Sequence, residues 1–336
     1  MSDEPGTTNA GAIRSSSVVS RKSFASSIVL LGAVLLAAIA LAIAVGDVSI
    51  DWSDATSRMI LLRLRLPRVI LAAAIGATLA VAGVTFQTLL RNPLADPFIL
   101  GVSGGAAAGA AIATALRWSR IPGLVPLIAF LSACAATAAV FLLARRRDHT
   151  DPARLLLSGL VLNAFFSAVI LIAFSLSRSA DLTAALRWMM GSLFGATWND
   201  VLVVTVPLIV GMVILTVVAN DLRLLAFGEE DAAARGVNVE RLKLIGFGTS
   251  SIITGAAVAV SGIIGFVGLL VPHLVRLIWR RDFRFLLPLC ALGGAVLVVA
   301  SDLLSRVIVD ATDLPIGAFT AILGIPFFLS LLRRSR

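Results

Sequence analysis

Long apolar runs, separated by short charged segments, dominate this amino-acid sequence. Runs of about 18 residues or more are long enough to cross the hydrocarbon core of a bilayer as α-helices. A helix also satisfies its own backbone hydrogen bonds in lipid. Because 59% of the residues are apolar and only 14% are charged, the chain differs from a soluble globular domain. The sequence therefore predicts an all-α integral membrane protein.

The apolar runs predict about ten transmembrane helices, near residues 28–46, 68–90, 96–116, 124–144, 154–175, 199–219, 243–263, 266–279, 285–304 and 315–332. Residues 1–27, rich in small and polar residues, are expected to form a disordered cytoplasmic tail. Residues 28–336 are then a single transmembrane domain. A cleaved signal peptide is the alternative for the first run, but its length favours a retained span.

The positive charges predict the orientation of the chain. Its net charge is +9, and alternate connections on one side hold roughly twice as many Lys and Arg residues as those on the other. This asymmetry predicts an even number of spans with both termini in the cytoplasm. The basic residues are scattered among the loops, which suits contact with anionic lipid and argues against a nucleic-acid partner.

An internal similarity suggests a repeat. Residues 76–84 resemble residues 255–263, at an offset of 179 residues (255 − 76). The two segments fall in the second and seventh predicted spans, which would cross the bilayer in opposite directions. An inverted repeat of this kind is common in transporters. The alternative is that helices rich in small residues resemble one another without being related.

Polar and helix-breaking residues interrupt the spans in two places. Prolines at the junction of the second and third spans prevent a regular helix from continuing, and a further proline is expected to break the short eighth span. Because interrupted spans often line a pathway, we predict a translocation path or gate at Gln87, Asn92, Pro93, Asp96, Pro272 and His273. The alternatives are an ordinary turn capped by Asn92 and Asp96, and a buried histidine at a kink.

The charged connection at residues 222–241 predicts a short helix at the cytoplasmic face. Acidic residues from Glu229 to Asp231 would begin it, and Arg235 followed by Gly236 would end it. This order suits the helix dipole at both ends. The helix is either a docking surface for a cytoplasmic partner or a solvated loop helix.

Arginines cluster on the opposite side, against the general trend. Arg63, Arg65 and Arg68 lie close together in the sequence, and guanidinium groups pair well with carboxylates. A partner protein with acidic side chains is therefore a candidate to bind this arginine cluster. Arg306 either joins this cluster or pairs with Asp302, four residues earlier on the same helix.

The sequence lacks the residues that several classes of function require. The sequence contains no phosphate-binding G-x-x-x-x-G-K-[ST] loop, no paired nucleophile and base within the spans, and only two histidines. Its two cysteines lie in apolar runs and are expected to be small buried hydrophobic residues. We therefore expect no catalytic residue, metal site or cofactor in this chain. A proton-driven transporter is the remaining alternative, although its titratable candidates lie near span ends.

Taken together, the motifs resemble the FecCD-type permease family, the membrane subunits of bacterial ABC importers for ferric siderophores, haem and vitamin B12. The resemblance covers nearly all of the chain after the tail. It is carried by RLPR (65–68), NPLADP (92–97), WMMGS (188–192), GFVGLLVPH (265–273), residues 302–306, LPIG (314–317) and GIPFF (324–328).

The resemblance implies a multi-pass permease of the bacterial cytoplasmic (inner) membrane. It implies a second permease subunit as homodimer or heterodimer partner, an extracytoplasmic substrate-binding protein, and a cytoplasmic ATPase dimer that holds ATP and Mg²⁺. Ferric siderophores are the expected substrates, with haem or cobalamin as alternatives. In this family, positions matching Arg65, Arg68 and Arg306 receive the binding protein. Those matching Gly228, Glu229, Ala232, Arg235 and Gly236 seat in the ATPase.

Overall fold

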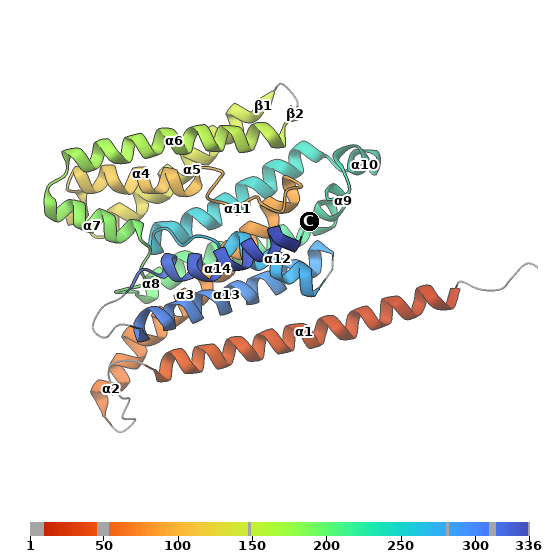
Figure 1. Ribbon diagram of the computed structural model, residues 1–336, viewed down its shortest axis with the longest axis horizontal. Helices are drawn as coiled ribbons and strands as arrows, with labels where there is room; N and C mark the ends of the chain where they lie inside the picture. The colour runs from red at the N-terminus through yellow and green to blue at the C-terminus, as the bar shows by residue number, and fades with distance from the viewer. Residues whose placement is uncertain (1–9, 46–53, 147–148, 280–281, 309–313, 335–336) are drawn as a thin grey trace, which may run out of the picture.

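The computed structural model describes residues 10–45, 54–146, 149–279, 282–308 and 314–334 (Figure 1). Apart from the short strand pair β1 (Arg145–Arg146) and β2 (His149–Thr150), the elements of this part of the chain are helices. The longer helices are α1 (Ala10–Ala44), α3 (Leu66–Leu89), α4 (Val102–Ala115), α5 (Leu124–Ala144), α6 (Pro152–Leu176), α8 (Trp198–Val217), α11 (Val239–Ser261), α12 (Val267–Ile278), α13 (Phe283–Val307) and α14 (Ile316–Arg334). The shorter helices are α2 (Ala55–Ile60), η1 (Leu61–Arg65), η2 (Trp118–Arg120), α7 (Ser179–Met189), α9 (Ala219–Leu225) and α10 (Glu229–Ala234).

The apolar helices match the ten predicted spans one for one. Seven helical segments in the described ranges are long and apolar enough to cross a membrane, and α4, α12 and α14 contribute three shorter apolar stretches. Helix α5 has the bounds that its apolar run predicted, Leu124–Ala144. The all-α membrane architecture is thus confirmed.

The N-terminal segment differs from the expectation. Helix α1 begins at Ala10, so the described part of the predicted disordered tail is helical, whereas residues 1–9 of that tail lie outside the described residues. The apolar part of α1 begins at Phe24. Because no proline precedes it within the helix, nothing in the sequence stops the helix from extending beyond the apolar span.

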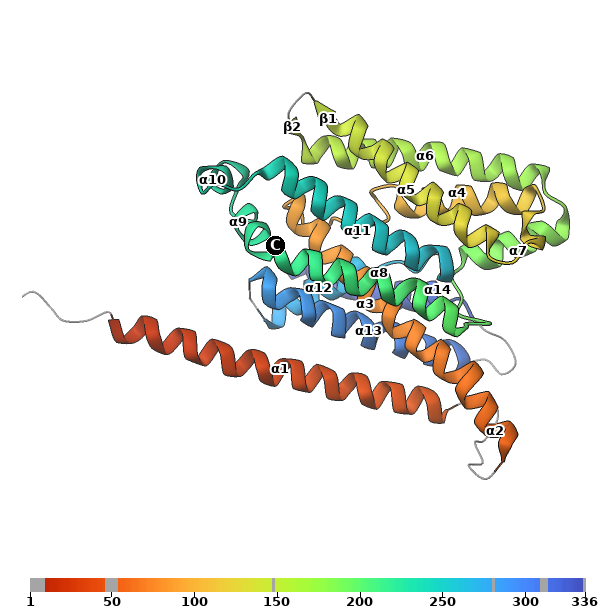
Figure 2. The same cartoon turned by 180° about the vertical axis from the view of Figure 1, so that it is seen from behind.

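Helix α3 occupies the centre of the bundle, where it packs against α8, α11, α12 and α13 (Figures 1 and 2). Glycines allow two of these neighbours to approach its backbone. A Cβ atom on Gly83 would lie 2.0 Å from the carbonyl oxygen of Gly268 in α12, and one on Gly76 would lie 2.1 Å from that of Gly294 in α13. Small residues permit such close helix packing in membranes.

The remaining long helices cover the two sides of this centre. Helices α4, α5 and α6 pack on one another and reach the centre through α11. Helix α1 lies on the opposite side, along α13 (Figures 1 and 2). Only 11% of the most apolar stretch of α6 is buried, so this helix presents an apolar face outward.

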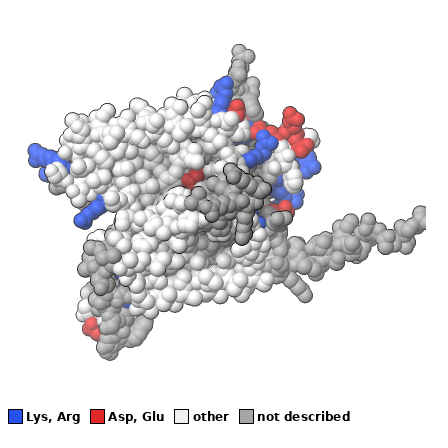
Figure 3. Space-filling model, viewed as in Figure 1, with Lys and Arg blue, Asp and Glu red and all other residues white. Residues whose placement is uncertain are grey.

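The two ends of the bundle carry different short elements. The α10 end carries α9, α10 and the β1–β2 hairpin, and the α2 end carries α2 and α7 (Figure 1). Helix α3 runs from the α2 end to the α10 end and α11 runs back, which are the opposite directions that the inverted repeat predicted. Acidic side chains gather around α10, and uncharged surface covers most of the bundle between the ends (Figure 3).

Candidate functional site

The arginines at the α2 end surround one buried carboxylate. The Asp302 side chain on α13 is only 1% exposed. Its Oδ1 accepts a hydrogen bond from Arg68 Nε at 2.9 Å, and its Oδ2 lies 3.2 Å from Arg306 Nε. The pairing of Arg306 with Asp302 along α13 is therefore confirmed, and Arg68, from α3, joins the same carboxylate.

The same cluster holds the C-terminal end of α1. Arg65 Nη1 donates to the carbonyl oxygen of Ile43 at 2.8 Å, and Arg306 Nη2 donates to that of Ala42 at 3.1 Å. The last carbonyls of a helix lack partners within the helix and favour cations. These arginines therefore cap α1 and fasten it to η1, which leads into α3, and to α13.

The three predicted docking arginines are largely buried. Arg65 is 8% exposed, and the side chains of Arg68 and Arg306 are 15% and 13% exposed. The pairing of Arg68 with Asp302 was hidden in the sequence because the two residues lie 234 residues apart. Reception of a partner's carboxylates by these residues stays a prediction.

The junction between α3 and α4 is an ordered turn. Asn92 Oδ1 accepts a hydrogen bond from the Leu94 N–H at 2.9 Å, and Asp96 Oδ1 accepts one from the Phe98 N–H at 2.8 Å. Asn163 of α6 donates to the Phe98 carbonyl at 3.0 Å, which fixes the turn to α6. The capped-turn interpretation therefore accounts for Asn92 and Asp96.

Helix α12 continues through Pro272, contrary to the expected break. Proline has no N–H, so the carbonyl of Gly268, four residues earlier, loses its helical donor. The Gln87 side chain of α3 supplies a replacement, because its Nε2 donates to the Gly268 oxygen at 3.2 Å. Gln87 Oε1 in turn accepts a hydrogen bond from Arg276 Nη1. His273 lies half-buried beside Pro272 in the same helix.

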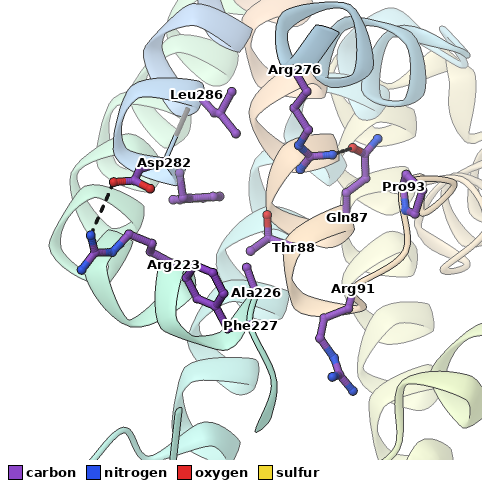
Figure 4. A pocket seen from close by; sticks show the side chains of 11 residues that line it. Gln87, Thr88, Arg91, Pro93, Arg223, Ala226, Phe227, Arg276, Asp282 and Leu286 are labelled. Atoms are coloured by element: carbon purple, nitrogen blue, oxygen red, sulfur yellow. Dashed lines mark hydrogen bonds and ion pairs between the residues drawn. The ribbon is translucent and has the colours of Figure 1, made fainter. Parts of the chain in front are cut away.

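A cavity of about 500 Å³ lies next to this Gln87–Arg276 contact (Figure 4). Of the predicted path residues, Gln87 and Pro93 line it, together with Thr88, Arg91, Arg223, Ala226, Phe227, Arg276, Asp282, Phe283 and Leu286. Arg223 and Asp282 form an ion pair in the wall of the cavity, with Arg223 Nη1 3.4 Å from Asp282 Oδ2. The other predicted path residues are not among the lining residues. The signal for the missed Arg276 was a positive charge inside a short apolar span, where ionisable residues are rare and functional.

The charged connection folds into two short helices, α9 and α10. Helix α10 spans Glu229–Ala234, close to the bounds that its acidic start and glycine end predicted. Gly228 and Gly236 flank it with φ values of +149° and +85°. Residues that carry a side chain rarely adopt such φ values. Ala232 is fully buried and Arg235 is exposed, so α10 packs on one face and presents its C-terminal end outward.

Comparison with known sequences identifies the family. The family model of the FecCD transport family matches residues 33–334. The chain belongs to the FecCD transport family.

Two relatives and a solved structure are similar to this chain over most of its length. The cobalamin import system permease protein BtuC of Halobacterium salinarum is 43% identical over 83% of this chain and 74% of its own length. The hemin transport system permease protein HmuU of Yersinia pestis is 41% identical over 85% and 87%. A structure of an inward-facing metal-chelate type ABC transporter has a TM-score of 0.84 and 30% identity, and the match covers 91% of this chain and 98% of that chain.

Membership in the FecCD family confirms the resemblance that the motifs carried. The chain is a multi-pass membrane permease of the ABC importer class. The proton-driven transporter is therefore set aside. Within this FecCD protein, the two ends of the bundle hold distinct clusters: the arginines around Asp302 at the α2 end, and the cavity and α10 at the other.

Proposed function

We propose that this chain moves a metal chelate, with a ferric siderophore as the first candidate, across the bacterial cytoplasmic membrane. The energy comes from ATP bound with Mg²⁺ in a separate ATPase dimer, and this chain holds no cofactor. The observation that carries the proposal is the match of residues 33–334 to the FecCD family. Haem and cobalamin are the alternative substrates, because HmuU and BtuC carry those names.

The assembly that we propose contains two permease subunits, the ATPase dimer and an extracytoplasmic binding protein. The α10 end faces the cytoplasm together with both termini, as the distribution of positive charge predicts. Helices α6 and α14, the fifth and tenth spans, line the path between the two subunits. Their contact with the substrate is weak, because a strong site within the path would slow release.

In this proposal α10 seats in the ATPase. Its position at the end of the bundle, with Ala232 buried beneath it and Arg235 exposed, suits that role. ATP binding draws the ATPase subunits together and moves α10, which switches the path between outward and inward access. The cavity beside Gln87 and Arg276 lies at this end, and we propose that it opens toward the inner mouth of the path.

At the α2 end, the proposed partner is the binding protein. Its acidic side chains would compete with Asp302 for Arg68 and Arg306. Because Asp302 already pairs with both arginines, each docking event exchanges one carboxylate for another. Such an exchange favours transient docking over tight binding.

Reconstitution tests the proposal. The chain, its ATPase and its binding protein are placed in proteoliposomes, and uptake of ⁵⁵Fe-ferrichrome, haemin and labelled cyanocobalamin is measured with and without ATP. Uptake of one probe that requires both ATP and the binding protein is expected. Ferrichrome uptake supports the siderophore, and haemin or cyanocobalamin uptake selects an alternative. Uptake driven by a proton gradient without ATP would refute the proposed function.

A further inference from the structure

Lys243 is a buried cation near the start of α11. It is one of only two lysines in the chain and is 2% exposed. Its Nζ donates to the Thr150 carbonyl oxygen at 2.6 Å, to Glu229 Oε2 at 2.7 Å and to Glu240 Oε1 at 3.1 Å. These contacts use all three donors of the ammonium group.

The acceptors of Lys243 belong to three different segments. Glu229 begins α10, Glu240 lies in the first turn of α11, and Thr150 ends the β1–β2 hairpin that joins α5 to α6. Thr150 also donates to Glu240, through its N–H at 3.1 Å and its Oγ1 at 2.6 Å. The hairpin and the start of α11 are therefore tied to each other as well as to the lysine.

Helix α10 depends on such contacts for its position. It has six residues, and a helix this short is marginal without tertiary support. The Glu229–Lys243 bond is a polar link from α10 into the bundle, and Ala232 adds apolar packing. Because the lysine and the Glu229 side chain are 3% and 15% exposed, water screens their attraction less than it screens a surface pair.

We propose that Lys243 is a positioning residue that makes α10 move as one body with α11 and with the α5–α6 hairpin. Through this joint, a displacement of α10 reaches α11, which packs on the central helix α3, and also α5 and α6, which flank the hairpin. Without the ammonium, the Glu229 carboxylate faces the Glu240 carboxylate and the Thr150 carbonyl oxygen, and repulsion loosens α10. This inference rests on the proposed function, because it requires an ATPase that moves α10.

The first test measures the joint itself by pulsed electron paramagnetic resonance. Cys134 and Cys290 are replaced by Ala, and spin labels are attached at the exposed positions Ala233 in α10 and Arg145 in the hairpin. The labelled chain is assembled with its ATPase in lipid nanodiscs. A narrow distance distribution is expected for the native lysine, and a broadened one for Lys243→Met.

The second test measures coupling in proteoliposomes. For whichever of ⁵⁵Fe-ferrichrome, haemin and cyanocobalamin the wild-type assembly transports, uptake per ATP hydrolysed is expected to fall about tenfold in Lys243→Met. ATP hydrolysis itself continues. Lys243→Arg keeps the charge and should recover part of the ratio. Arg284→Met, which removes an exposed charge at the same end of the bundle, is the matched control and should match wild type.

A narrow distribution together with an unchanged ratio in Lys243→Met would overturn the joint. If that variant does not assemble, Glu229→Ala removes the α10 arm and leaves Lys243 bonded to Glu240 and Thr150. An unbroadened distribution in Glu229→Ala would then overturn the inference. Absence of ATP-dependent uptake in the wild type refutes the proposed function instead, so the two failures are distinguishable.

Discussion

Replacing Asp302 by Asn tests whether this carboxylate holds the α2 end together. The change preserves the volume of the side chain and one acceptor oxygen, but it removes the negative charge between Arg68 and Arg306. Both arginine side chains are at least 85% buried. Two guanidinium groups then remain side by side without their shared carboxylate, and the cap on the last turn of α1 weakens because Arg306 also holds that turn.

Removing one partner from a buried ion pair costs about 3–5 kcal/mol. The retained amide oxygen and the partial exposure of the arginines place Asp302→Asn near the lower value, about 3 kcal/mol. At about 2 °C per kcal/mol for a large chain, the midpoint of thermal unfolding should fall by about 6 °C.

Tryptophan fluorescence of the purified chain in detergent measures this midpoint. The matched control is Asp181→Asn in α7, at the same end of the bundle. Asp181 Oδ2 lies 3.9 Å from Arg117 Nε, and these side chains are 25% and 37% exposed. Its loss should cost less than about 1 kcal/mol. Equal shifts in the two variants would refute the reasoning. In an Asp302→Asn/Arg306→Gln double variant, the cost should be smaller than the sum of the single costs, since the two residues interact.

Three further predictions concern the centre and the α10 end. Gly83→Ala should prevent stable folding, because its Cβ would lie 2.0 Å from the Gly268 oxygen. In the control Gly248→Ala, the added Cβ meets nothing within 4 Å, and the unfolding midpoint should not change. Fluorescence-detected size exclusion compares the two variants. Arg235→Glu, at an exposed position, should abolish uptake in proteoliposomes without lowering the unfolding midpoint or the binding protein's ligand affinity, and normal uptake would contradict docking of α10. Gln87→Leu should cost about 1–3 kcal/mol by leaving the Gly268 carbonyl without its donor, and an unfolding midpoint equal to that of wild type would show that this carbonyl needs no replacement partner.

The helices were predictable because each apolar run carries its own evidence. A segment such as Leu124–Ala144 must form a helix in lipid whatever surrounds it, and its bounds follow from where the apolar run stops. Helix α10 was equally local, with its acids at one end and a glycine at the other. The start of α1 was missed because a helix extends past its apolar part when no residue ends it.

The polar contacts were not predictable, because their partners are far apart in the chain. Lys243 bonds to Thr150, 93 residues away, and Gln87 bonds to Gly268, 181 residues away. Composition and spacing show that Lys243 and Arg276 are unusual, but not what they touch. Pro272 shows the same limit, because the expected break assumed that no other helix would supply the missing donor.

The bond from Gln87 to the Gly268 carbonyl also fixes the register of α3 against α12. Sliding α12 along its axis by one residue would carry the Gly268 carbonyl, which lacks its helical donor, away from the Gln87 amide. It would also place a Cβ where Gly268 now meets Gly83. The hydrogen bond and the glycine contact therefore hold α3 and α12 in one position along their axes. We therefore expect α3 and α12 to move as one unit when the protein changes conformation.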